Sequence, residues 1–364
     1  MSFRTGGGGR FSSSSGNTAN AGFLTTGTAG LNLGYEIKKN QNLNADYFYN
    51  YTNFDSGLEF TTRTEYIGDA EILSEIKSNS ENMSNKHTLN FNYRDRSRPL
   101  SSTYIRGSVS QNNNDNFSQN LLDKFNAQGQ LDLQSIGVSK RISDNGSGNI
   151  LFRHTKRFNE ESRRHLSSYF QFSGSNAEST RSNDQINTFN ISDPDNQFTN
   201  KEEIIKKQDL ENINTTFKIS YTEPLTEHHF LELGAGFNYK NTDDDVDQVR
   251  LKNDTTVNPL VYQQYYKNNN LSGELKYKFD KNDFTLSAGA TLLQQTLKFG
   301  LKNLDEVETV YTNINPAINF RYRPKRGKFM NFRANRSINL PSLNQLSPVI
   351  NDFDPLFIRQ GNPE

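Results

Sequence analysis

Residues 213–239, INTTFKISYTEPLTEHHFLELGAGFNY, decide the fold class of this 364-residue chain. Apolar and polar side chains alternate in both halves of the stretch; in the second half, Leu231 and Leu233 flank Glu232. A period of two sends successive side chains to opposite faces of a β-strand. Residues 222–229, between the two halves, fit a turn. The stretch therefore predicts an antiparallel hairpin with one apolar face and one polar face.

Five further pairs of segments show the same period, so we expect about twelve antiparallel strands that meander from neighbour to neighbour. The links within pairs hold about four to eight residues and the links between pairs about 20 to 40, an alternation typical of membrane barrels. The long links are polar, as in residues 111–119 (QNNNDNFSQ) and 243–247 (DDDVD), which predicts solvated loops. The five pairs are residues 31–37 with 43–51, 89–93 with 105–109, 150–154 with 166–172, 271–279 with 284–292, and 314–322 with 330–334.

The composition agrees with strands that meet lipid on one side only. Only 32% of the residues are hydrophobic and the mean hydropathy is −0.84, which is too polar for a soluble fold of this length. The 26 Phe and 16 Tyr argue against a disordered chain. We therefore predict an all-β antiparallel meander that forms part of a transmembrane outer-membrane β-barrel. Five tyrosines near strand ends are expected in its interfacial girdles: Tyr49, Tyr51, Tyr221, Tyr239 and Tyr322.

Charge, cysteine content and hydropathy exclude several other classes. Lys plus Arg and Asp plus Glu are both 41, which argues against a nucleic-acid partner. The absence of Cys removes thiol nucleophiles and Cys-based zinc sites, and no apolar run is long enough for a helical span. Residues 1–10 lack the apolar core of a signal peptide, so we expect an internal fragment. Its expected parts are a Gly/Ser-rich extracellular loop (1–25), the strands (26–335) and a final loop (336–364), with the barrel incomplete at both ends.

Three segments resemble the barrel domain of TonB-dependent outer-membrane receptors. The first is residues 27–50, GTAGLNLGYEIKKNQNLNADYFYN, which follow a Gly-rich loop at residues 6–9. The second, YTEPLTEHHFLEL at residues 221–233, is similar to the family's turn at Tyr221, Thr222, Glu223, Pro224 and Leu225. The third, RSINLPSLNQLSPVINDFDPLFIRQGNP at residues 336–363, is similar to a family signature at Pro341, Ser342, Gln345, Leu346, Pro348, Pro355, Leu356, Gly361, Asn362 and Pro363.

The resemblance implies a receptor in the Gram-negative outer membrane that imports a scarce solute through a plugged barrel of about 22 strands. Its partners would be outer-membrane lipid, the TonB complex through a plug absent from this chain, and an unknown siderophore, glycan or peptide. The alternative is a structural or adhesive barrel without active transport. An outer-membrane enzyme would need a convergent catalytic set, which the sequence does not offer. We therefore expect neither enzymatic activity nor a cofactor.

Charged residues on the polar side of the strands are the main candidates for function. They are expected to wet the lumen and to brace a plug through ion pairs, and a role for some in ligand contact stays open. Mixed charges of both signs do not define a selective site. The residues are Glu36, Asp46, Arg94, Arg106, Lys218, Glu232, Glu274, Lys276, Arg321 and Arg333.

Other motifs are better explained without a ligand. Residues 6–10 (GGGGR) lack the Lys-Ser/Thr of a phosphate loop. The histidines at 87, 154, 165, 228 and 229 show no metal-ligand spacing, and a solvated turn is favoured for the pair at 228 and 229. Asp243, Asp244, Asp245 and Asp247 could bind calcium in a loop, but solvation is favoured because the glycine and distal glutamate of an EF-hand are absent.

Overall fold

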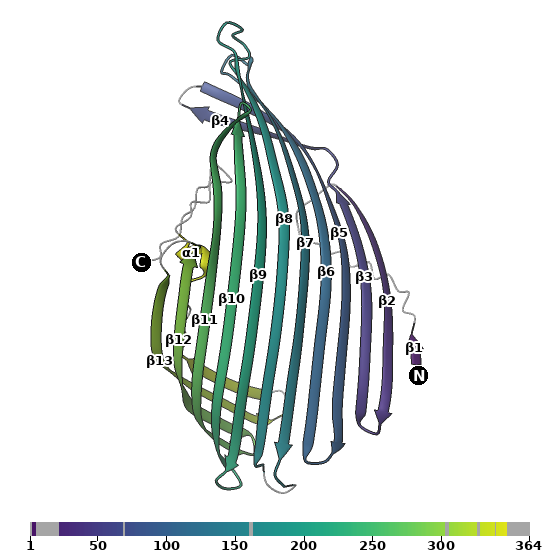
Figure 1. Cartoon of the computed structure of the whole chain (residues 1–364), viewed down its shortest axis with the longest axis vertical. Helices are drawn as coiled ribbons and strands as arrows, with labels where there is room; N and C mark the ends of the chain where they lie inside the picture. Colours follow the sequence, from purple (N-terminus) through teal and green to yellow (C-terminus); the bar gives the residue numbers. More distant parts are fainter. Residues whose placement is uncertain are drawn as a thin grey trace.

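The chain folds into one large antiparallel sheet whose strands run side by side along the long axis of the molecule (Figure 1). Every strand except β4 follows the chain order β1 to β14, and β4 pairs with β5 beside this path. Among the described strands, β1 and β14 stand at the two ends of this order and do not pair with each other, so the sheet has two free edges. The computed structural model describes residues 2–4, 22–67, 70–159, 163–302, 306–325, 328–338 and 340–347.

The sheet contains strands of very different length. β1 has three residues, whereas β5 has 29. None of the helical residues described forms a segment with the length and apolar character needed to cross a membrane. The elements are β1 (Ser2–Arg4), β2 (Phe23–Lys38), β3 (Gln41–Asp55), β4 (Glu59–Ile67), β5 (Ala70–Arg98), β6 (Ser101–Phe125), β7 (Leu131–Arg157), β8 (His165–Phe189), β9 (Phe198–Pro224), β10 (His229–Lys252), β11 (Thr255–Lys281), β12 (Phe284–Leu301), β13 (Val307–Lys325), β14 (Lys328–Asn335) and α1 (Leu343–Leu346).

The twelve predicted strands are confirmed as the six hairpins β2–β3, β5–β6, β7–β8, β9–β10, β11–β12 and β13–β14. In the hairpin that decides the fold class, Phe217 lies opposite Phe237 and Tyr221 opposite Leu233. Two strands were not predicted. β1 pairs with the middle of β2, and β4 pairs with the first residues of β5. β4, EFTTRTEYI, is rich in Thr and aromatic residues, which favour strands and were a usable signal.

The predicted long polar loops are wrong, because these residues extend the strands instead. Residues 111–119 lie inside β6 and residues 243–247 lie inside β10. The connections between hairpins shrink accordingly, to residues 126–130 after β6 and residues 253–254 after β10. A 27-residue strand such as β9 is roughly 90 Å long, far more than the apolar band of about 25 Å. Outside that band both faces can be polar, so the period of two vanishes while the backbone ladder continues.

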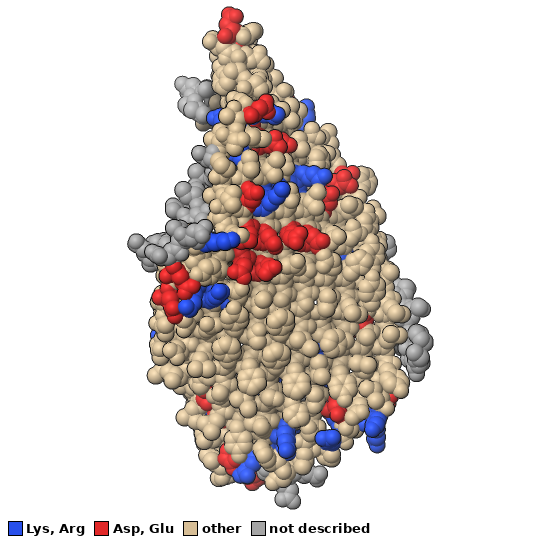
Figure 2. Space-filling model, viewed as in Figure 1, with Lys and Arg blue, Asp and Glu red and all other residues tan. Residues whose placement is uncertain are grey.

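The apolar and the charged side chains of the strands lie on opposite faces of the sheet, as the alternation predicts. Phe217 and Leu233 are 45% and 46% exposed on one face, whereas Lys218 and Glu232 lie on the other. Figure 2 shows charges gathered over the upper part and along the lower rim of the visible face, with a broad charge-poor band between them. The exposed apolar side chains on the face of Phe217 and Leu233 we call the apolar belt: Leu31, Leu33, Leu89, Phe91, Phe170, Phe172, Phe217, Ile219, Leu233, Phe237, Leu271, Leu275, Leu292, Ile314 and Ile318.

Candidate functional site

The opposite face, which we call the lumen face, carries the predicted charged row. Residues that lie opposite each other on neighbouring strands share a face of the sheet. Glu232 lies opposite Lys276, and Arg106 lies opposite Asn92. The alternation of side chains then fixes every other residue of each strand. Followed across the sheet, the register puts all ten predicted charges on the lumen face: Glu36, Asp46, Arg94, Arg106, Lys218, Glu232, Glu274, Lys276, Arg321 and Arg333.

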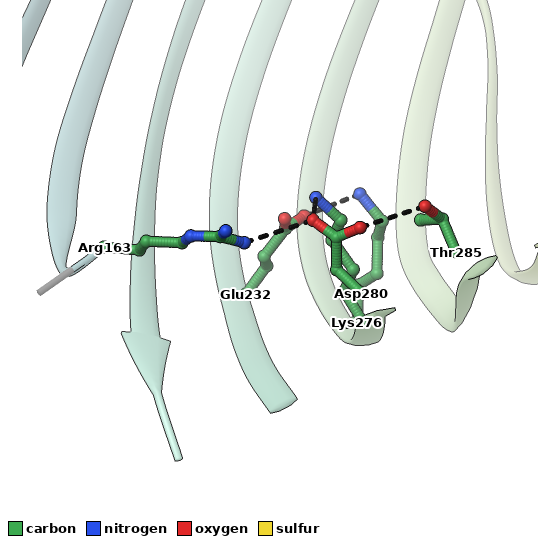
Figure 3. A network of polar contacts seen from close by, with 6 residues as sticks. Arg163, Glu232, Lys276, Asp280 and Thr285 are labelled. Atoms are coloured by element: carbon green, nitrogen blue, oxygen red, sulfur yellow. Dashed lines mark hydrogen bonds and ion pairs between the residues drawn. The ribbon is translucent and has the colours of Figure 1, made fainter. Parts of the chain in front are cut away.

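Near the short turns, some of these charges form ion pairs (Figure 3). The Lys276 ammonium donates to Glu232 Oε2 at 2.6 Å, between adjacent strands β10 and β11. Asp280 accepts from Arg163 Nη1 at 3.1 Å and from Thr285 Oγ1 at 3.0 Å. The side chains of Glu232 and Lys276 are 28% and 34% exposed, so such a pair is worth at most about 1 kcal/mol. The contacts link the turn before β8 to β11 and β12, and thus brace this part of the wall.

An aromatic ring, that of Phe230, lies close to two cationic side chains of this part of the wall, Arg163 and Lys278. Phe230 on β10 is only 3% exposed. The Arg163 guanidinium lies 5.2 Å from its ring centroid and the Lys278 ammonium lies 5.9 Å from it. Cations over an aromatic face are attracted by the ring quadrupole. Sequence reasoning missed Arg163, Lys278, Asp280 and Phe230. They lie in turns or near strand ends, where the alternation of polar and apolar residues does not show which side chains contact one another.

The segment Tyr221–Leu225 lies where β9 ends, as the resemblance implied. Glu223 accepts hydrogen bonds from the Tyr221 hydroxyl and from the Arg164 guanidinium, and the Leu225 N–H donates to the His229 carbonyl at 2.8 Å. The hydrogen bond to Glu223 raises the pKa of Arg164, which lies in the turn before β8. The segment therefore ties two neighbouring short turns together. Thr222 is buried, Pro224 is half-buried, and Leu225 is exposed.

Part of the third resembling segment, the signature at residues 336–363, forms a short helix on the lumen face. Leu346 of α1 is 9% exposed and packs with Tyr266, Leu297 and Phe299 of β11 and β12. Gln345 Oε1 accepts from the Ser342 N–H at 2.8 Å and from its hydroxyl at 3.0 Å, next to Pro341. The expected loop is therefore helical at this point, and Ser342-x-x-Gln345 is a capping-box pattern that could have predicted it. Pro348, Pro355, Leu356, Gly361, Asn362 and Pro363 lie outside the described residues.

The aspartates of residues 243–247 do not gather around one point. They lie in a strand, so Asp244 faces the lumen side while Asp243, Asp245 and Asp247 face outward. Asp244 is 4% exposed and accepts from Gln208 Nε2 at 2.6 Å and from Gln264 Nε2 at 2.7 Å. In the part of the chain that the structure describes, no group of three or more His, Asp or Glu is placed to hold a metal ion.

The glycine-rich motif at residues 6–10 lies outside the described residues. Three of the histidines contact aromatic or polar neighbours. His87 Nδ1 lies 2.8 Å from the Tyr47 hydroxyl, and His154 Nδ1 lies 3.0 Å from Thr103 Oγ1. His229 contacts the Tyr277 hydroxyl and lies 4.9 Å from Phe279 between ring centroids. These rings therefore belong to cross-strand contacts of the wall.

An antiparallel meander with an exposed apolar belt on one face and ion-paired charges on the other is the wall of a transmembrane β-barrel. The sequence profile of the outer membrane protein beta-barrel family matches residues 156–364, and the chain belongs to that family. This family places the protein in the outer membrane. Neither a curated protein nor a solved structure matches the chain. Both the turn at Tyr221–Leu225 and the signature that begins at Pro341 lie within the matched region.

Proposed function

We propose that this chain forms part of the barrel wall of a TonB-dependent receptor in the outer membrane of a Gram-negative bacterium. The receptor would import a scarce siderophore, glycan or peptide. The observation that carries the proposal is α1, the helical part of the receptor-like signature, packed on the lumen face through Leu346. A charged lumen face suits a water-filled channel or a plug held by ion pairs. TonB would act through a plug supplied outside this chain, and the wall itself would perform no bond chemistry.

The test is uptake in cells of the source bacterium. Accumulation of labelled ferric siderophores, oligosaccharides and peptides is measured in three strains: wild type, a deletion of this gene, and a deletion of TonB. We expect one class of solute to stop accumulating in both deletions. If accumulation depends on this gene but not on TonB, the barrel is a passive channel.

The competing function is a structural or adhesive barrel. The strand extensions beyond the apolar belt would offer it a contact surface, because β9 and β10 carry exposed polar residues such as Asp209 and Asp245 far from the short turns. Unchanged uptake of every solute in the gene deletion, together with loss of attachment to surfaces or to other cells, would support this function and contradict import.

A further inference from the structure

The lumen face of β5, β6 and β7 has a concentration of arginines around one hollow. Arg94, Arg96 and Arg98 follow one another at alternate positions of β5, and Arg153 and Arg157 do so at a spacing of four on β7. These five side chains line a cavity of about 690 Å³ beside the β5–β6 turn. Hydroxyl groups of Ser102, Thr155 and Tyr104 belong to the same lining. The cavity volume lies in the range of sites for small molecules.

The carboxylates of the described residues do not neutralise these guanidinium groups by direct contact, although Glu36 lines an adjoining hollow together with Arg94. Among the described residues, none of the five forms an ion pair within 4.0 Å, whereas Lys276, Arg163 and Arg164 all do. The nearby carboxylate of Asp95 is engaged by Ser97, whose N–H and hydroxyl donate to it at 2.9 and 2.7 Å, although it attracts Arg98 at longer range. Arginine stays protonated in proteins, so five like charges gather around one hollow, and no carboxylate of the described residues forms an ion pair with them.

The arrangement suits an anion held from two sides. β5 and β7 are separated by β6 alone, so their backbones run about 10 Å apart on either side of the hollow. Each guanidinium can bind a carboxylate or phosphate group through two parallel N–H donors. The Arg94 guanidinium lies 6.0 Å from the ring centroid of Tyr104, which limits the directions that it can take. A molecule with a single negative charge would leave most of these donors unused.

We propose that this pocket binds a small polyanion, a solute that carries two or more carboxylate or phosphate groups. Binding requires only the folded wall and no energy from TonB, so the proposal does not rest on import. If import occurs, a polyanion would meet the pocket at the short-turn end of the lumen face.

The experiment uses the full-length protein purified in detergent. Binding of citrate and of pyrophosphate is measured by titration calorimetry at low and high salt, with glycerol as the uncharged probe. We expect both anions, but not glycerol, to bind, and high salt to weaken binding. Arg94→Gln with Arg153→Gln should reduce affinity about 100-fold, since each lost charge-assisted contact costs about tenfold. The control, Arg321→Gln, removes a lumen-face arginine of β13 and should leave affinity unchanged within about twofold.

Heat-modifiable gel mobility confirms that each variant is folded. If the glutamine variant does not fold, the variant Arg94→Lys with Arg153→Lys is measured instead, because it keeps the charges and removes the paired donors. Its affinity for the anions should be lower than that of the wild type. Unchanged affinity would overturn the proposal. Absence of binding to the wild-type protein, or equal loss in Arg321→Gln, would overturn it too. Binding of a glutamate-rich peptide without binding of either small anion would assign the pocket to a protein segment and contradict the proposed ligand class.

Discussion

Glu232 and Lys276 face each other across adjacent strands of the lumen wall, with the carboxylate Oε2 and the ammonium Nζ 2.6 Å apart. Both side chains are about one third exposed, so water screens the pair and limits its contribution. We expect a double-mutant cycle with Glu232→Gln and Lys276→Met to give a coupling free energy of about 0.2 to 1 kcal/mol. Urea unfolding in detergent, followed by gel mobility, measures it. A coupling near zero would show that the pair does not brace the wall.

Asp244 and Asp245 are neighbours in the chain that should respond very differently to substitution. Asp244 is 4% exposed and accepts from two glutamine side chains, whereas Asp245 is exposed. Asp244→Ala leaves the amide groups of Gln208 and Gln264 without their acceptor, which costs about 1 to 3 kcal/mol. Asp245→Ala, the matched control, removes an exposed acceptor of Gln263 Nε2 and one of two facing carboxylates, since Asp209 lies opposite, and should change stability by less than about 0.5 kcal/mol. Equal effects would mean that both residues face solvent, as in a loop.

The contrast between these two residues shows what the sequence could and could not predict. Within the apolar belt, lipid on one face and water on the other impose a period of two, so strand positions and faces such as Phe217 and Lys218 were predictable. Beyond the belt no apolar face is required, and residues 243–247 have the composition of a loop although they form a strand. Cross-strand contacts such as that between Asp244 and Gln208 hold them there. Composition alone does not reveal such pairing, because it joins residues distant in the sequence.

The candidate site was predictable to the same limited degree. The ten lumen charges follow from alternation, but which of them form ion pairs depends on turns and strand ends. Arg163, in the turn before β8, and Asp280 of β11 are 117 residues apart, and they can meet because the strand order leaves only β9 and β10 between β8 and β11. The alternate arginines 94, 96 and 98 were a visible pattern, whereas their proximity to Arg153 depends on the pairing of β6 with β7.

Docking of α1 depends on Leu346, which is 9% exposed against an apolar patch of the lumen face. Leu346→Ala should weaken docking by about 2 to 3 kcal/mol, because a leucine in a packed site loses burial and leaves a cavity. The chain has no Cys, so Ser347→Cys, at a position 7% exposed, provides a single reporter thiol. Its maleimide labelling should be slow and should accelerate at least about tenfold with Leu346→Ala. Leu225→Ala, at an exposed family-motif leucine, is the control and should not change the labelling rate.

Glu306 makes one end of the wall sensitive to acid. It precedes β13, at the end away from the short turns, and accepts from the Tyr265 hydroxyl at 2.6 Å and the Lys298 ammonium at 2.9 Å. The Tyr265 hydrogen bond, followed by that from Lys298, lowers the pKa of Glu306 below its ordinary value of 4.5. Because the folded pKa is the lower one, this stabilisation is present above pH 4.5 and disappears as the pH falls through the folded pKa.

The corresponding measurement is the urea midpoint of wild type and Glu306→Gln between pH 3 and pH 8, a range chosen about the ordinary carboxyl pKa. The wild type should be the more stable above pH 4.5, and the gap should narrow at lower pH. Glu59→Gln, an exposed substitution on β4, serves as the control and should give parallel curves. A gap that widens with acid would contradict the sign of the lowered pKa.

Ile219 and Ser220 are adjacent residues that face lipid and lumen respectively, and an arginine placed at each one tests the whole assignment of faces. Ile219 belongs to the apolar belt, lies opposite Ala235, and is close to Phe217, so Ile219→Arg would place a charge in hydrocarbon near the midplane. Such a substitution costs about 2 to 4 kcal/mol, whereas a lumen charge remains in water. Ser220→Arg adds the same side chain one residue away, on the face that already carries Lys218. In outer-membrane fractions of cells that make the full-length protein, Ile219→Arg should strongly reduce the heat-modifiable folded band, and Ser220→Arg should leave it near the wild-type amount. Normal assembly of the first variant with loss of the second would show that the two faces are inverted.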